Sequence, residues 1–504
     1  MAALMIQGCG SDVGKSVLVA GLCRLFANRG HVVRPFKPQN MSNNAAVTEP
    51  DDKGPHAGRR GEIGRAQALQ AIACRTPLTV DMNPVLLKPQ SDVGAQLVVR
   101  GQVEASYGAM AYQARKAALL QVVLDSFHRL EAEADLVIVE GAGSPAEINL
   151  RSGDIANMGF ALAADVPVVL VGDIDRGHVI AALVGAKAVL DTADGAAIRG
   201  FIINKFRGEP ALFYDGRREI ERRTGWPDLG LVPWLAAARR LPAEDAVVLG
   251  QPGEASPRRI RIAVPILRHI ANFDDFDPLQ AEPSVDLSYV PPGSALPGDA
   301  DLIILPGSKA TLSDLAFVRT QGWDIDIAAH VRRGGRVMGV CGGFQMLGRT
   351  VSDPNGIEGA PGSAPGLGLL EVDTVLTDDK VLEPCRGLTP GGAPYEGFEM
   401  HMGRTTGEGL TSPWLRRTDD AGASASVGEG AISADGRVFG AYVHRLFDSG
   451  PARAELLAGL GAASTALDHR LQVDRALDEI AAALETHLDV AALARLAGLK
   501  EFKP

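Results

Sequence analysis

The sequence has few cysteines and no pair of the C-x-x-C type. Its five cysteines lie scattered over 504 residues, at positions 9, 23, 74, 341 and 385. An odd, scattered set in a long chain is typical of a reducing compartment, and it argues against both a disulfide framework and a zinc site. We therefore expect these cysteines to be free thiols, at least one of which has a chemical role.

Long apolar runs are also absent. No stretch reaches the roughly 18 consecutive apolar residues that are needed to span a bilayer. The start of the chain enters a strand-like segment without the basic, apolar and cleavage regions of a secretory signal. The expected location is therefore the cytoplasm, with no membrane partner.

An excess of basic residues is the third feature that the sequence lacks. The formal net charge is −11, which argues against a general nucleic-acid or membrane-surface binder, because such proteins favour basic faces. A local glycine-rich loop can still bind an anion. Hydrophobic and charged contents of 46% and 22% are those of a soluble globular protein, and the length predicts two to four domains.

A phosphate-binding loop is predicted near the start of the chain. A short strand, 4–7, leads into Gly8–Ser16 (GCGSDVGKS), and a helix follows over 17–28. In a P-loop, backbone N–H groups cradle phosphate oxygens, the lysine reaches the β/γ-phosphates and the serine ligates Mg²⁺. The spacing is a variant, because Cys9 occupies the position of the usual first glycine. The predicted nucleotide-binding residues are Gly10, Ser11, Asp12, Val13, Gly14, Lys15 and Ser16.

Buried strands alternate with helices through the rest of the first half. Apolar runs at 135–139, 166–171 and 200–203 indicate a parallel sheet that helices cover on both faces. Glu140 ends the first of these runs, where a carboxylate near Mg²⁺ and phosphate is expected, although an ordinary strand-end acid is the alternative. Asn204 and Lys205 follow the last run and suit recognition of a nucleotide base, or form a solvated turn.

A second α/β series follows a linker. Residues 246–259 are rich in Pro, Gly, Ala and Glu and separate a first domain, 1–245, from a second, 260–504. The second domain has predicted strands at 260–267, 285–290 and 301–305, then a helix that starts near Ser313. Its end, from about residue 452, has apolar residues at helical spacing, which we interpret as packing.

The most informative stretch of the second half is Gly339–Gly343 (GVCGG). It stands between an apolar strand and a helix, which is the pattern of a nucleophile elbow with a cysteine as the nucleophile. The glycines accommodate a strained turn and leave Cys341 accessible. The alternative is a buried cysteine in a glycine-rich turn.

A histidine downstream gives the cysteine a candidate base. The strand 438–443 ends at His444, from which an imidazole can take the thiol proton and later protonate a leaving group. Gly307, in a loop after the strand 301–305, and Gly342 are the predicted oxyanion-hole donors.

The two halves together resemble the cobyric acid synthase family over essentially the whole chain. The first half is similar to P-loop enzymes of the dethiobiotin-synthetase type, and the second to class I glutamine amidotransferases. The P-loop, the strand end Val139–Gly143 and the cysteine elbow carry this resemblance. Six further segments carry it as well: Lys37–Met41, Asn83–Pro89, Gly172–Gly177, Asn204–Arg207, Gly397–Arg404 and Tyr442–His444.

The resemblance implies a function. It implies ATP- and glutamine-dependent amidation of the b, d, e and g carboxylates of adenosylcobyrinic acid a,c-diamide, with Mg²⁺ held by Ser16 and Glu140 and ammonia released at Cys341. The expected partners are glutamine and a corrinoid, without nucleic acid. We also expect a solvent-excluding path for ammonia between the domains, because bulk water would protonate it.

One departure and two competing functions stand beside this resemblance. Two residues after the histidine, where most amidotransferases have a glutamate, this chain has Leu446, so the partner of His444 is open among Asp448, Glu399 and a backbone carbonyl. The a,c-diamide synthase of the same pathway shares both domain types. A nucleotide-switch ATPase of the partition type matches the first half, but such a switch has no use for an ammonia source.

Overall fold

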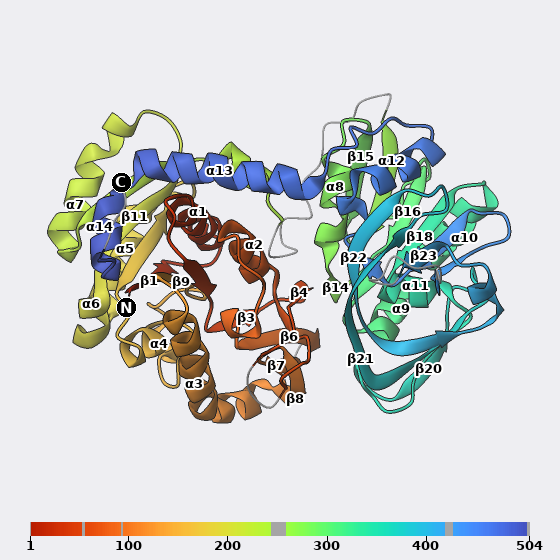
Figure 1. Cartoon of the computed structure of the whole chain (residues 1–504), viewed down its shortest axis with the longest axis horizontal. Helices are drawn as coiled ribbons and strands as arrows, with labels where there is room; N and C mark the ends of the chain where they lie inside the picture. The colour runs from red at the N-terminus through yellow and green to blue at the C-terminus, as the bar shows by residue number, and fades with distance from the viewer. Residues whose placement is uncertain (1, 53–55, 92–93, 243–258, 419–426, 501–504) are drawn as a thin grey trace.

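The chain forms two α/β bodies that lie side by side along its long axis (Figure 1). The computed structural model describes residues 2–52, 56–91, 94–242, 259–418 and 427–500. Of the predicted linker 246–259, only residue 259 is among them. No helix of the described residues is long and apolar enough to cross a membrane, and none of the five cysteines forms a disulfide.

The first body is built on a six-stranded parallel sheet, as the sequence predicts. Consecutive residues of its strands point to opposite faces and join two separate apolar cores: Met5 and Leu170 one core, Leu4 and Val169 the other. Both faces are therefore buried, which explains the continuous apolar runs. In sheet order the strands are β12 (Asp228–Pro233), β11 (Ile198–Phe206), β10 (Val168–Asp173), β1 (Ala2–Gly8), β9 (Leu136–Glu140) and β2 (Val33–Phe36).

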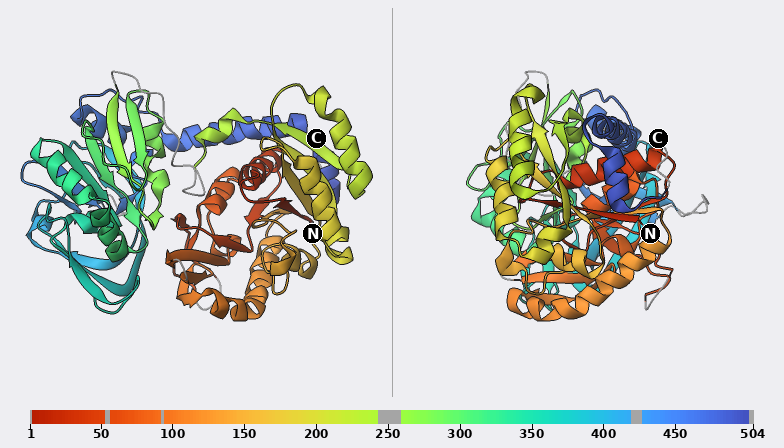
Figure 2. Two further views of the ribbon diagram at one scale, coloured as in Figure 1. Left: turned by 180° about the vertical axis from the view of Figure 1, so that it is seen from behind. Right: turned by 90° about the vertical axis from the view of Figure 1, so that its left-hand side faces the viewer.

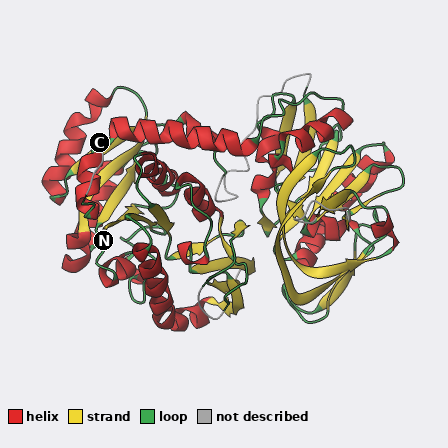
Figure 3. Ribbon diagram, viewed as in Figure 1, coloured by secondary structure: helices red, strands yellow, loops and turns green. Residues whose placement is uncertain are grey.

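Helices cover both faces of this sheet (Figure 3). One core contains α1 (Lys15–Asn28) and the other contains α3 (Ala109–Ala132), α4 (Met158–Ala163), α5 (Val179–Val189) and α7 (Tyr214–Thr224).

A smaller sheet projects from the first body toward the second (Figure 1). It carries two of the six segments that mark the family resemblance, at 37–41 and 83–89. Residues 62–64 form a strand, and the helix that follows begins at Arg65. The elements are β3 (Gln39–Met41), β6 (Val85–Ser91), β7 (Gly94–Val99) and β8 (Gln102–Gly108), with the pair β4 (Ala45–Val47) and β5 (Glu62–Gly64), and α2 (Arg65–Ala73).

The second body has a mainly parallel sheet with a curved, mainly antiparallel sheet beside it. The helix predicted to start near Ser313 begins at Thr311. The first sheet has the order β15 (Val285–Val290), β13 (Ile260–Pro265), β16 (Leu302–Leu305), β18 (Arg336–Val340), β26 (Val438–Ala441) and β25 (Ala431–Ile432). The second contains β20 (Gly362–Pro365), β19 (Thr350–Asp353), β21 (Asp373–Leu388), β22 (Pro394–Thr406) and β27 (Val443–His444), with β23 (Leu415–Thr418) and β24 (Val427–Glu429). Its helices include α9 (Thr311–Thr320), α10 (Trp323–Arg332), α11 (Gly342–Leu347) and α12 (Gly450–Gly459).

The C-terminal tail returns to the first body. The sequence assigned it to the domain 260–504, but helices α13 (His469–His487) and α14 (Val490–Ala497) bury their apolar stripe in the core that contains α1. The left view of Figure 2, which shows the molecule from behind, shows α13 running from one body to the other. A Cβ atom at Gly21 would lie 2.5 Å from Leu484 and 2.6 Å from Ile480, so α1 and α13 are in close contact. The stripe is a packing surface, as predicted, but its partner is the other domain.

Candidate active site across the domain interface

The phosphate-binding loop joins β1 to α1. Gly14 precedes the helix with φ 91°, in the left-handed region that favours glycine. A Cβ atom there would also lie 2.4 Å from the Asn204 side-chain nitrogen. The Lys15 side chain folds back over the loop, where Nζ donates to the backbone oxygens of Gly10 (2.9 Å) and Gly143 (3.2 Å). The loop therefore has the geometry of a phosphate cradle, with its lysine at the centre.

Glu140 lies directly beside the serine of this loop. Ser16 Oγ donates to Glu140 Oε1 at 2.8 Å, Lys37 Nζ donates to the same oxygen at 2.9 Å, and Gln70 donates to the other carboxylate oxygen. A hydroxyl and a carboxylate in contact suit Mg²⁺, which takes few protein ligands and completes its octahedron with phosphate oxygens and water. The described residues contain no group of three or more His, Cys, Asp or Glu that could hold a metal ion.

Asn204 and Lys205 support the loop from the neighbouring strand end. Asn204 Nδ2 donates to the backbone oxygen of Val13 at 2.8 Å. Lys205 Nζ donates to the backbone oxygen of Asp12 and, at 2.9 Å, to Asp173 Oδ2. The two residues contact the backbone of the P-loop, which the sequence did not predict; recognition of a base by them stays a prediction.

The cysteine elbow forms as predicted between β18 and α11. Cys341 has φ 52° and ψ −110°, in the left-handed region that a non-glycine residue rarely adopts. Its neighbours must be glycine, because a Cβ at Gly343 would lie 2.1 Å from the Leu305 oxygen and one at Gly342 would lie 2.9 Å from the Ser308 nitrogen. The turn holds Cys341, 7% exposed, at the edge of a pocket.

His444 lies beside this cysteine and is oriented by Asp275. Its Nδ1 donates to Asp275 Oδ2 at 2.7 Å, and the other carboxylate oxygen accepts from the Arg445 backbone at 2.8 Å. Both Asp275 and His444 are at least 95% buried. A thiol, an imidazole and a carboxylate in this arrangement have the geometry of a nucleophilic triad.

Sequence reasoning missed Asp275. The two acids it considered have other partners: Asp448 pairs with Arg445, while Glu399 pairs with Arg417 and, at 3.2 Å, with His401. Asp275 lies in a short 3₁₀ turn, η6 (Phe273–Phe276), near the start of the second domain and far from His444 in sequence. The acidic pair at 274–275, soon after the first strand of the domain, was the available signal.

The electrostatic setting of His444 favours its charged form. Burial lowers its pKa, but the charges of Asp275 and Cys341 and hydrogen bonds to both more than offset this and raise the pKa to about 10. The imidazolium is therefore favoured at neutral pH, with Asp275 on one ring nitrogen and Cys341 near the other.

The strand β22, which contains the family segment 397–404, forms one wall of the site. Phe398 pairs with His444 in the sheet and stacks on its ring, with centroids 5.3 Å apart. The backbone oxygen of Met400 accepts from Cys341 Sγ at 3.5 Å. This segment therefore holds both reactive side chains from one side, a role that its sequence alone did not suggest.

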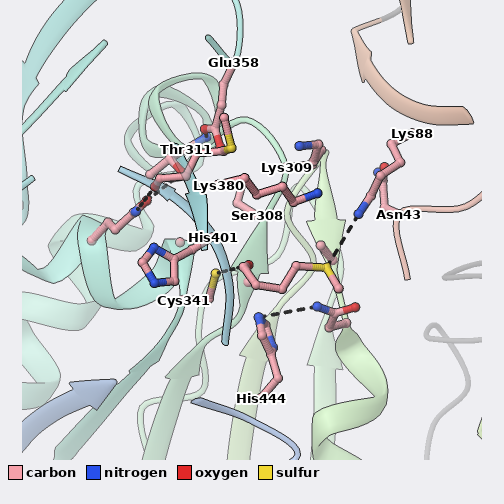
Figure 4. Close-up of a pocket in the computed structure, with 17 residues that line it drawn as sticks. Asn43, Lys88, Ser308, Lys309, Thr311, Cys341, Glu358, Lys380, His401 and His444 are labelled. Carbon is pink, nitrogen blue, oxygen red and sulfur yellow. Dashed lines mark hydrogen bonds between the residues drawn. The ribbon is translucent and has the colours of Figure 1, made fainter. Parts of the chain in front are cut away.

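Residues of the other domain form part of the wall of the pocket beside Cys341 (Figure 4). The predicted oxyanion-hole residues Gly307 and Gly342 both line it, together with Cys341 and His444. From the first body come Asn43 and Lys88, whose Nζ lies 3.9 Å from Met400 Sδ. The site is therefore shared between the domains.

Buried charges join the domains at the same place. Glu62 of the first body pairs with Lys88, at 2.7 Å, and with Lys380 of the second. Burial raises the pKa of Glu62, but the neighbouring lysine charges hold it well below its usual value. Burial lowers the pKa of Lys380 to about 7, although the negative charge of Glu62 acts in the opposite direction. These charges are costly to bury unless they are paired, so the loss of one partner would leave an uncompensated buried charge.

Two family models match the chain. A CobQ/CobB/MinD/ParA nucleotide binding domain matches residues 4–248, and a CobB/CobQ-like glutamine amidotransferase domain matches residues 261–452. Together they confirm the predicted fold of the two halves.

Curated relatives named cobyric acid synthase match the chain over nearly its full length. The relative from Caulobacter sp. (strain K31) is 69% identical over 501 residues, which covers 99% of this chain and 100% of the relative. The relative from Sphingopyxis alaskensis is 60% identical and covers 99% of each chain, and that from Methylocella silvestris is 58% identical and covers 98% of this chain and 100% of the relative. The chain therefore belongs to the cobyric acid synthase family of glutamine-dependent amidating ligases.

Proposed function

We propose that the chain converts adenosylcobyrinic acid a,c-diamide to adenosylcobyric acid. ATP would activate the b, d, e and g side-chain carboxylates, and ammonia from glutamine would amidate them. The observation that carries this proposal is a Cys341–His444–Asp275 arrangement whose pocket is lined in part by residues of the P-loop domain. A glutaminase site that faces a phosphate-binding domain has a direct use for its ammonia.

The second domain would release the ammonia. Cys341 Sγ attacks the side-chain amide carbon of glutamine, while the backbone N–H groups of Gly307 and Gly342 stabilise the oxyanion. His444 protonates the departing nitrogen, which leaves a thioester, and then takes a proton from the water that hydrolyses it. Asp275 holds the imidazole in the orientation that both steps need.

The first domain would activate the corrin carboxylate. A carboxylate is a poor electrophile, so transfer of the γ-phosphoryl group of ATP converts it to an acyl phosphate that ammonia can attack. Lys15 is the residue of this chain that is positioned to neutralise charge on the β/γ-phosphates. Ser16 and Glu140 would hold Mg²⁺, which supplies positive charge to the phosphate oxygens when it is bound.

The shared pocket supports delivery of ammonia from one domain to the other. Residues of both bodies line it, and Cys341, His444 and Lys88 in its wall are each less than 10% exposed. Ammonia that crosses here is shielded from protonation by bulk water.

The proposal is tested by the mass of the product. Incubation with adenosylcobyrinic acid a,c-diamide, ATP, Mg²⁺ and glutamine should yield a corrinoid with four added amides. Cobyrinic acid, offered in parallel, should be a poor substrate. Preferred amidation of cobyrinic acid, stopping at two amides, would instead identify an a,c-diamide synthase.

The role of Asp275 gives a separate prediction. Asp275→Asn should lower kcat for glutamine hydrolysis about 1,000- to 10,000-fold, because an amide can donate to Nδ1 and so hold the imidazole in the wrong tautomer. Amidation driven by added ammonium should stay near the wild-type rate. Asp448→Asn is the matched control, since Asp448 pairs with Arg445 instead; equal losses in both variants would contradict the assignment.

The same variant has an expected effect on stability. The pKa of His444 is raised from 6.5 to about 10 in the folded protein, chiefly by Asp275 against the effect of burial. The resulting stabilisation is fully present below pH 6.5 and is lost as the pH rises through about 10. The deficit of Asp275→Asn in free energy of unfolding should therefore shrink between these two pH values in denaturant titrations.

A further inference from the structure

A loop of the P-loop domain holds one residue of the glutaminase domain by reciprocal hydrogen bonds. The side-chain oxygen of Asn44 accepts from the backbone N–H of Asn272 at 2.7 Å. In return, the backbone N–H of Ala45 donates to the side-chain oxygen of Asn272 at 3.1 Å. Asn44 and Asn272 are 2% and 4% exposed, so water does not replace these bonds.

The bonds fix which way the Asn272 amide points. Because its oxygen accepts from Ala45, its nitrogen Nδ2 must face the other way, where it lies 3.4 Å from His444 Nε2 (Figure 4). Asn272 itself has φ 51°, in the left-handed region, a conformation that costs free energy and needs support from its surroundings.

This contact acts on the reactive nitrogen of the histidine. A protonated Nε2 directs its hydrogen to Cys341, with which His444 shares a hydrogen bond. Once that proton has left with the ammonia, Nε2 becomes an acceptor, and the Asn272 amide is in place to donate to it. Asn272 thus holds the imidazole in position in the state that must next activate water.

A second contact reaches the same site from the P-loop domain. Arg65, the first residue of α2, pairs with the buried Asp274 at 2.8 Å, next to Asp275. Its guanidinium also lies 5.7 Å from the centroid of the Phe398 ring, which stacks on His444. The backbone N–H of Arg65 donates to the backbone oxygen of Asn44 at 3.1 Å, so the two contacts are joined.

We propose that Asn44 of the P-loop domain is a positioning residue for glutamine hydrolysis, acting through Asn272 on His444. The proposal rests on the glutaminase function proposed above. The glutaminase site is then incomplete without the other domain. Helix α2 also bears Gln70, which bonds to Glu140 beside the P-loop, so one element contacts both reaction sites.

The first test separates positioning from glutamine binding. Asn44→Ala in the full chain should lower kcat for glutamine hydrolysis about 10- to 100-fold, the scale expected for a misplaced catalytic group, with KM for glutamine within about twofold. Asn44→Asp, which retains the acceptor oxygen, should recover most of this loss. Amidation driven by added ammonium, measured in the same preparations, reports that the protein is folded.

A matched control and a double variant complete the design. Leu382→Ala trims the same domain interface, where Leu382 packs beside Phe398 and Met400, and should leave kcat near wild type. Asn272→Ala should reproduce the defect of Asn44→Ala, and the double variant should lose no more than the worse single variant. If Asn44→Ala does not fold, Asn44→Leu fills the same space without an acceptor and carries the same expectation.

Two results would overturn the inference: an Asn44→Ala variant that matches Leu382→Ala in kcat, or losses that multiply in the double variant. Failure of the proposed glutaminase function looks different, because glutamine hydrolysis would then survive in Cys341→Ala.

Discussion

Cys341→Ala is expected to abolish glutamine-driven amidation while amidation driven by added ammonium continues. Without the thiol no thioester forms, and loss of a nucleophile typically costs at least about 10,000-fold in kcat. The acyl phosphate is made in the other domain, and ammonia from solution can still meet it. Product formation is followed by mass spectrometry, with glutamine or ammonium chloride as the nitrogen source.

The matched control for this variant is Cys385→Ala. Cys385 is also a buried thiol of the second domain, 4% exposed in β21. Burial raises its pKa to about 12, which leaves it unreactive at neutral pH. Equal activity of both variants with glutamine, or equal loss of both activities in Cys341→Ala, would contradict the proposed division of labour.

Features that depend on neighbouring residues could be predicted from the sequence. The P-loop and the cysteine elbow each need glycine where the backbone turns left-handed or comes close to another strand, so both leave a readable pattern. His444 was predicted because it ends a strand downstream of the cysteine elbow. In the structure β18 and β26 are parallel neighbours, so the two strands end at the same edge of the sheet.

Features that depend on distant residues could not be predicted. Asp275 and His444 are 169 residues apart in sequence, and no spacing rule connects them. The tail shows the same limit: its stripe predicted a packed helix, but an apolar face does not identify its partner. The sequence did not predict that Lys88 and Glu62 are buried. Both are charged residues on strands, and they form a buried ion pair where the second domain packs against the first.

The contrast suggests how the two activities share one chain. Each reaction centre contains a local motif that identifies its chemistry. The contacts between the centres are made by single polar residues: Asn44, in the loop before β4, and Arg65, on α2. Those contacts are buried and paired, so loss of one partner leaves an unsatisfied group at the interface. Substitution of one of these residues should therefore weaken the coupling between the two sites.

Lys15→Ala is expected to remove amidation with either nitrogen source and to leave glutamine hydrolysis measurable. The Lys15 ammonium is held over the loop by the backbone oxygens of Gly10 and Gly143, where it can contact the β/γ-phosphates. Loss of this charge removes stabilisation of the phosphoryl transfer, so the rate of amidation should fall at least about 100-fold. Lys187→Ala, on α5 with its Nζ over the Trp226 ring, is the control and should retain both activities. Parallel assays of glutamate release and corrin amidation decide the result. Full amidation by Lys15→Ala would remove the P-loop from the mechanism. Loss of amidation with persisting glutaminase activity would show that the two centres are chemically independent. Any dependence of glutamine hydrolysis on the first domain must then pass through the contacts at the interface.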